Sequence, residues 1–206
     1  MKPMHTPLAR ISTPTYKGNL LFLLILLFSC LAGPGTLLAK EASITDLAVS
    51  NSDTELLLYL SVRDCFTAEM ETGLHNGIPA TFTFYVDLYQ SRKAWPDHKI
   101  VSHVFNRTLT YDNLKEEYSI ISSTNNKNAT TQSLAQAKTL MSEVMDFRIV
   151  DLNHLESEST YTLRVKVKLA KKTLPLYFHY LIPFSSLWDF ETDWHTIDFR
   201  YTKALQ

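Results

Sequence analysis

A strict alternation of apolar and polar side chains runs from Ala80 to Tyr89. Phenylalanine, valine and leucine occupy every second position, and threonine, tyrosine and aspartate occupy the positions between them. This period of two is that of a β-strand with one buried and one exposed face, whereas an amphipathic helix repeats its apolar residues every three to four positions. The segment therefore predicts the clearest strand of the chain.

The same period of two recurs along most of the chain after residue 43. Beyond a turn at Arg92–His98, apolar side chains return at alternate positions from Val101 to Tyr111, which predicts a long antiparallel hairpin with the first strand. Similar alternation predicts strands at Ile44–Val49, Leu56–Val62, Glu117–Ser122, Phe147–Leu152, Tyr161–Leu169 and Trp194–Tyr201. We expect the first two of these six to form a hairpin.

Two segments change to helical spacing. Thr67–His75 begins with an N-cap residue, and the Asn76-Gly77 pair supplies its end. Gln132–Met145 carries apolar residues on one helical face. The polar stretch Ser123–Thr131, between the predicted strand Glu117–Ser122 and the second helix, is expected to be a surface loop. Together these patterns predict an α+β fold, a twisted antiparallel β-sheet of about six to eight strands with two packed helices.

The N-terminal segment has the organisation of a secretory signal peptide. Three basic residues precede an apolar run from Leu20 to Ala32, and the helix breakers Gly33-Pro34-Gly35 follow it. As a helix, this run would span roughly 20 Å, which is short of the roughly 30 Å of a bilayer core. We expect residues 1–39 to be a signal peptide cleaved after Ala39, leaving residues 40–206 as a single exported α+β domain.

Two other fates of this segment stay open. Extended through Ala39, an uncleaved segment is long enough to anchor the protein in a membrane. The stretch from Leu27 to Cys30 resembles a bacterial lipobox, in which acylation of the cysteine retains a lipoprotein at a membrane, although the bulky Phe28 and the position of Cys30 inside the apolar run count against it. The expected location is the periplasm, with membrane anchoring as the alternative.

Composition excludes several classes of protein. The chain has 20 basic and 21 acidic residues, so it lacks the bulk positive charge that attracts nucleic acid, and we expect no nucleic-acid partner. Its 2 cysteines cannot form a disulfide-dense scaffold or a four-cysteine zinc site. Cys65 is the one that follows the predicted signal peptide, and we expect it to be a buried, small apolar residue.

An acidic and aromatic segment near the C-terminus is a candidate metal site. Four potential ligands share one parity there: Asp189, Glu191, Asp193 and His195. Carboxylates and an imidazole on one face of a strand can bind a divalent cation. A single straight strand would mix these polar groups with apolar ones such as Ile197, however, and a bulge or turn between Glu191 and Trp194 removes that conflict. We therefore expect no metal site.

The sequence contains no local catalytic motif. Neither H-E-x-x-H nor G-x-S-x-G occurs, and 5 glycines leave little material for a phosphate-binding loop. We therefore expect a non-enzymatic protein with no catalytic residue and no cofactor.

The turn of the long hairpin is the candidate contact surface. An exposed tryptophan among charged neighbours on a loop suits partner binding, whereas a tryptophan folded back onto the sheet would be structural. The candidate binding residues are Arg92, Lys93, Trp95, Asp97 and His98. A different hypothesis is a carrier of a hydrophobic or lipid ligand, with a cleft lined by Phe82, Phe84, Phe105, Tyr177 and Phe178.

A basic stripe on the predicted strand Tyr161–Leu169 admits two interpretations. Arg164, Lys166 and Lys168 alternate with apolar residues and therefore share one face, and Lys171 and Lys172 follow them. Such a face can attract an anionic lipid or polymer, but it is more often the solvated side of a sheet that discourages edge pairing. We expect the second.

Four stretches in order resemble an uncharacterised bacterial family. They are Gly77-Ile78-Pro79, Thr81–Tyr89, Trp95-Pro96-Asp97 and Leu109–Tyr118, the last with a Tyr-x-x-Leu-x-x-x-Tyr pattern. Their order is similar to that in the family catalogued as domain of unknown function 4390, and the likeness extends from about Ile44 to Tyr201. The turn has one tryptophan where members often have more, and the C-terminal segment is variable. The resemblance implies an exported α+β protein of Gram-negative bacteria with a role in the cell envelope and no assigned catalytic residue.

The sequence therefore predicts an exported, non-enzymatic cell-envelope protein, a periplasmic binding or interaction module whose partner is an envelope protein or a lipid. A carrier of a hydrophobic ligand is the first alternative. A metal-dependent hydrolase is the last.

Overall fold

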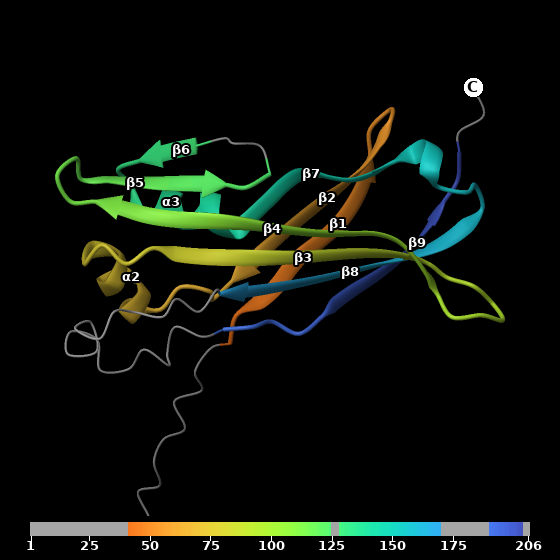
Figure 1. Cartoon of the computed structure of the whole chain (residues 1–206), viewed down its shortest axis with the longest axis horizontal. Coiled ribbons are helices and arrows are strands. Elements are labelled where there is room, and N and C mark those ends of the chain that lie inside the picture. Colours follow the sequence, from red (N-terminus) through yellow and green to blue (C-terminus); the bar gives the residue numbers. More distant parts are fainter. Residues whose placement is uncertain (1–40, 125–127, 170–189, 204–206) are drawn as a thin grey trace, which may run out of the picture. The chain divides into compact units, whose positions relative to one another are not determined.

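The computed structural model describes residues 41–124, 128–169 and 190–203. The predicted signal peptide and Cys30 lie outside these residues. The described part of the chain forms strands and the two α-helices α2 (Ala68–His75) and α3 (Leu134–Ser142), shown in Figure 1. A 3-10 turn covers Leu152–His154. The strands are β1 (Ser43–Asn51), β2 (Glu55–Arg63), β3 (Ala80–Gln90), β4 (His98–Asp112), β5 (Glu117–Ser122), β6 (Asn128–Thr131), β7 (Glu143–Asp151), β8 (Ser159–Leu169) and β9 (His195–Tyr201).

The described strands form two antiparallel sheets. One has the order β1-β2-β7, and the other has the order β6-β5-β4-β3-β8-β9. The α+β class with a mainly antiparallel sheet and two helices is thus confirmed. The division into two sheets differs from the single sheet we expected. The first hairpin pairs with β7 and does not extend the larger sheet.

The core lies where the two sheets bury their apolar faces. The alternating pattern that predicted β3 is the buried face, because Phe82, Phe84, Val86 and Leu88 are fully buried. The smaller sheet contributes the alternate residues Leu56, Leu58, Leu60 and Val62 of β2. Both sets belong to one hydrophobic cluster. The period of two in each strand therefore places one face of each sheet in a shared core.

Helix α2 begins where the sequence predicts, whereas α3 begins at Leu134, two residues after the predicted start. The Thr67 side chain accepts a hydrogen bond from the Met70 backbone N–H, and Ser133 caps α3 in the same way. Met70 and Met141 are buried in the core, one from each helix. Gly77 follows the C-terminal end of α2. Its φ of 78° is a left-handed conformation that favours glycine. No helix in the described residues is long and apolar enough to span a membrane.

The C-terminal end of the predicted second helix is wrong. That helix ends at Ser142, and residues 143–145 begin strand β7. Val144 pairs with Leu60 of β2 and is 2% exposed. Burial of this valine in the sheet outweighs the local helical spacing, since propensity is weaker than tertiary packing.

The predicted surface loop is also wrong over its last four residues. Asn128–Thr131 form β6, which pairs with β5 at the edge of the larger sheet. Thr131 is buried and its hydroxyl donates to the Gln136 side chain. A polar strand of this length carries no hydrophobic alternation, so the sequence pattern does not show it.

Cys65 is a free, buried cysteine, as predicted. Its Sγ lies 3.4 Å from the Val62 carbonyl oxygen. Burial raises the pKa of the thiol to about 12. The thiolate is the reactive form of cysteine, so this side chain is a core residue and no nucleophile at neutral pH.

Candidate functional site

The turn between β3 and β4 carries the predicted contact residues, and all of them are exposed. Every residue from Ser91 to Lys99 is exposed, and the Trp95 side chain is 76% exposed. Trp95 is therefore not folded back onto the sheet. Arg92, Lys93, Trp95 and Asp97 lie on this short turn, and His98 is the first residue of β4.

The base of this hairpin is fastened to β8. The Ser91 backbone N–H donates to the Thr160 carbonyl at 2.9 Å, and the Ser91 hydroxyl hydrogen-bonds with that of Thr162 at 3.1 Å. Gln90 donates to the Glu156 carboxylate at 2.6 Å. The exposed turn is thus presented by a fixed support, which lowers the conformational entropy that binding at the turn would cost.

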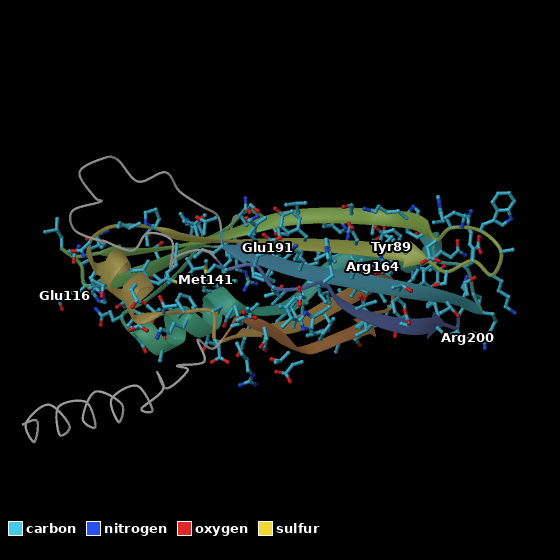
Figure 2. All side chains as sticks on the ribbon, turned by 90° about the horizontal axis from the view of Figure 1, so that it is seen from below. Tyr89, Glu116, Met141, Arg164, Glu191 and Arg200 are labelled. Carbon is cyan, nitrogen blue, oxygen red and sulfur yellow. The ribbon has the colours of Figure 1, made fainter. Side chains whose placement is uncertain are left out.

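Tyr89 forms a cation–aromatic group on the polar face of the larger sheet, next to the hairpin base. The Lys99 ammonium lies 5.2 Å from the centre of its ring, and the Arg164 guanidinium lies 4.8 Å from it. Tyr89 and Arg164 lie next to each other in Figure 2. Two cations on one ring are favourable contacts, and they keep the tyrosine in place at the exposed surface. Sequence analysis missed this group, although the shared parity of Tyr89 and Asp87 pointed to that face.

Asp87 supplies the negative charge in this group. The Lys99 ammonium lies 2.9 Å from one carboxylate oxygen, and the Ser102 hydroxyl donates to the other at 2.5 Å. Burial by itself would raise the pKa of Asp87, but the hydrogen bonds from Ser102 and Lys99 outweigh it and the pKa is lowered. The hydrogen bond to Asp87 in turn raises the pKa of Lys99. Both groups are charged at neutral pH.

The basic stripe on β8 is partly neutralised by Glu191. The Lys166 ammonium forms an ion pair with this carboxylate, and the Lys168 ammonium lies 2.8 Å from it. Hydrogen bonds from Lys166 and then Lys168 lower the pKa of Glu191 to about 2. Lys166 also lies 5.7 Å from the centre of the Trp194 ring. Of the three stripe cations that the structure describes, Lys166 and Lys168 therefore have an acidic partner. Lys171 and Lys172 lie outside the described residues.

A bulge separates the predicted metal ligands. Glu191 pairs with Lys168, whereas His195 pairs with Val165, so the segment has one residue more than the facing part of β8. Thr192 fills the bulge and is 2% exposed. Because of this shift, Glu191 lies on the polar face of the sheet and His195 lies on the buried face. The bulge expected between Glu191 and Trp194 is thus present.

The other members of the predicted metal cluster do not complete it. Asp189 lies outside the described residues. His195 Nδ1 lies 3.1 Å from the backbone carbonyl oxygen of Asp193. Among the residues that the structure describes, no group of three or more His, Cys, Asp or Glu side chains could hold a metal ion.

Three of the predicted cleft residues are packed in the core. Phe82 and Phe84 are fully buried, and Phe105 is 5% exposed. The Phe84 and Phe105 rings stack with their centres 4.8 Å apart, and Phe105 stacks on Phe147 of the other sheet at 4.4 Å. These rings fill space between the sheets. Tyr177 and Phe178 lie outside the described residues.

These features define the class of the protein. It is an α+β protein with two antiparallel sheets and an exposed hairpin turn that β8 supports. The chain belongs to the family described as "Domain of unknown function (DUF4390)", whose match covers residues 39–198. The resemblance seen in the sequence is thus confirmed. No curated protein and no solved structure matches the chain.

Proposed function

We propose that the protein is an exported, non-enzymatic component of the cell envelope that binds another envelope component through the turn between β3 and β4. The observation that carries the proposal is the 76% exposure of Trp95 at the end of a hairpin whose base is hydrogen-bonded to β8. A large aromatic side chain left in water on a fixed support gains free energy when a partner covers it. Tryptophan is among the residues that contribute most at protein interfaces.

The neighbours of Trp95 suit the rim of such an interface. Arg92 and Lys93 precede it and Asp97 and His98 follow it, and all four are exposed. Charges of both signs around one aromatic side chain can select a complementary partner surface without attracting every polyanion. The balanced number of acidic and basic residues in the chain agrees with a specific partner more than with bulk electrostatic binding.

Export is the second part of the proposal, and it rests on the sequence. The apolar run from Leu20 to Ala32 after three basic residues supports passage through the secretory pathway. The expected result is a protein in the periplasmic fraction whose N-terminus, determined by mass spectrometry, is Lys40. A protein found in the cytoplasmic fraction would refute export, and an intact N-terminus in the membrane fraction would replace cleavage by anchoring.

Affinity capture from envelope extract tests the contact surface. The full chain is immobilised beside its Trp95→Ala variant and a Trp194→Ala variant, because Trp194 is also exposed, at 46%, but lies on the larger sheet away from the turn. We expect a retained protein or lipid that is lost with Trp95→Ala and kept with Trp194→Ala. Equal retention by all three proteins would show that the turn is not the contact surface.

A further inference from the structure

A cleft of about 310 Å³ lies between β4 and β7, which belong to different sheets. The turn proposed above as a contact surface contributes nothing to it. The side chains of β4 and β7 make most of its wall, and the end of β5 with the following residues closes one side. The lining residues are His103, Phe105, Arg107, Ser122, Thr124, Val144, Met145, Asp146, Phe147 and Arg148.

Arg107 carries a partly buried positive charge in this cleft. Its Nη1 donates to the backbone carbonyl oxygens of Leu140, at 2.9 Å, and Glu143. Its guanidinium also lies 5.7 Å from the centre of the Phe84 ring. Within the described residues, no carboxylate lies within ion-pair distance of Arg107, and no hydrogen bond leaves from its Nε or Nη2. A guanidinium has five N–H donors, so the Nε and Nη2 groups of this partly buried arginine remain available to a ligand.

The environment of Arg107 favours an anion as that partner. Burial lowers the pKa of the guanidinium, which means that the surroundings disfavour its positive charge. A bound anion would offset this cost. The planar guanidinium keeps one free edge, formed by Nε and Nη2, which suits the paired oxygens of a phosphate or carboxylate better than it suits a halide.

The other charged groups of the cleft leave this site available. Asp146 is the acid among the lining residues, and its carboxylate accepts a hydrogen bond from Tyr59. Arg148 is largely exposed and is paired with Glu55 at 3.2 Å. His103 uses its Nε2 to donate to the Ile149 carbonyl at 2.6 Å.

Apolar side chains also line part of the cleft, beside the hydroxyls of Ser122 and Thr124. The stacked rings of Phe105 and Phe147 border it, and Met145 at its rim is 68% exposed. A volume of about 310 Å³ is at the lower end of the range of roughly 300–1,000 Å³ for small-molecule sites. The cleft therefore has room for a small molecule with one polar end and a short hydrocarbon part.

We propose that the cleft between β4 and β7 binds a small ligand that presents a phosphate or carboxylate group to Arg107 and an apolar part to Phe147 and Met145. The anion completes the hydrogen bonding of the guanidinium. The apolar part covers the methionine side chain, which water now surrounds.

Isothermal titration calorimetry on the full chain tests the ligand class. The probes are hexyl phosphate, hexanoate, inorganic phosphate and hexanol. We expect hexyl phosphate or hexanoate to bind at least about tenfold more tightly than hexanol, because a charge-assisted hydrogen bond contributes about that factor. If inorganic phosphate binds as tightly as the alkyl compounds, the site takes a free oxyanion. If inorganic phosphate binds more weakly than hexyl phosphate and hexanoate, the site takes a lipid-like ligand. Hexanol that binds as tightly as the anionic probes would overturn the proposal, as would no binding of any anionic probe at millimolar concentration.

Three variants test the location. Arg107→Gln should weaken the anionic probe about tenfold or more. Met145→Glu adds a negative charge at the rim without disturbing the core, and we expect a loss of about tenfold through repulsion. Val104→Glu is the matched control, because Val104 is 60% exposed on β4, the adjacent wall strand, but has the opposite parity to the lining residues.

Circular dichroism shows whether each variant keeps its fold. If Arg107→Gln does not fold, Met145→Glu decides the question, because Met145 is exposed. Equal weakening by Met145→Glu and Val104→Glu would overturn the proposal, as would unchanged affinity in a folded Arg107→Gln protein. Trp95→Ala should leave probe binding unchanged, so the failure of this site and the failure of the hairpin contact are distinguishable.

Discussion

Replacing Phe84 with alanine tests whether the aromatic rings between the sheets are packed core or the wall of a ligand cleft. Phe84 is fully buried, and its ring stacks on Phe105 at 4.8 Å with an interplanar angle of 5°. A buried Phe→Ala substitution costs about 3–5 kcal/mol, including the cavity that it leaves. This cost already includes the loss of the aromatic pair, which contributes about 0.5–1.5 kcal/mol.

This cost is a large part of the stability of a small domain, which is about 5–15 kcal/mol. For a domain of this size, each kcal/mol lowers Tm by about 2–4 °C, so we expect a decrease of roughly 6–20 °C. Urea denaturation followed by circular dichroism measures the free energy of unfolding, with Val104→Ala as the control because Val104 is 60% exposed. A loss below about 1.5 kcal/mol would refute the packed-core reasoning and favour a cleft that already contains space beside Phe84.

Two further predictions concern β8 and the segment that follows Phe190. In Glu191→Gln, the two lysine contacts of a carboxylate with a pKa of about 2 are weakened. The pKa of Glu191 in the folded protein is below the ordinary value of 4.5. The stabilisation by its two lysine contacts is therefore present above pH 4.5 and is lost as the pH falls toward 2. A Tm difference between wild type and variant that does not shrink over this pH range would contradict this prediction. In Thr192→Val, the Val167 N–H loses the hydroxyl that accepts its hydrogen bond at 3.0 Å, and we expect a loss of about 1–3 kcal/mol in urea denaturation. Thr196→Val, at an exposed position of β9, should change stability by less than about 0.5 kcal/mol, and an equal loss would show that the hydroxyl of Thr192 has no such role.

The strands with one apolar face could be predicted from the sequence. The alternation in Ala80–Tyr89 gave β3 within one residue at its C-terminal end, because burial of every second side chain is both the pattern and the cause of the strand. The start of α2 could be predicted for a similar reason, since Thr67 hydrogen-bonds within its own turn. In both places the physical cause lies in neighbouring residues.

The grouping of these elements could not be predicted, because it depends on contacts between distant residues. Whether β2 joins the larger sheet or pairs with β7 is decided by partners such as Val144, and that valine lies within a segment with helical spacing. The candidate site shows the same division. The hairpin turn and Trp95 could be predicted from a local pattern, whereas Arg107 looks like any polar residue of an alternating strand until β7 is placed beside it.

The hydrogen bonds from His103 and Arg107 to β7 also bear on how the protein behaves at high concentration. β7 is an outer strand of its sheet, and an outer strand offers backbone groups to which a strand of a second molecule can add. The carbonyls of Ile149 and Glu143, near the two ends of β7, already accept hydrogen bonds from β4 side chains. An incoming strand would have to compete with these side chains for the two carbonyls, so the contacts that hold the two sheets together also hinder the addition of a strand at this edge.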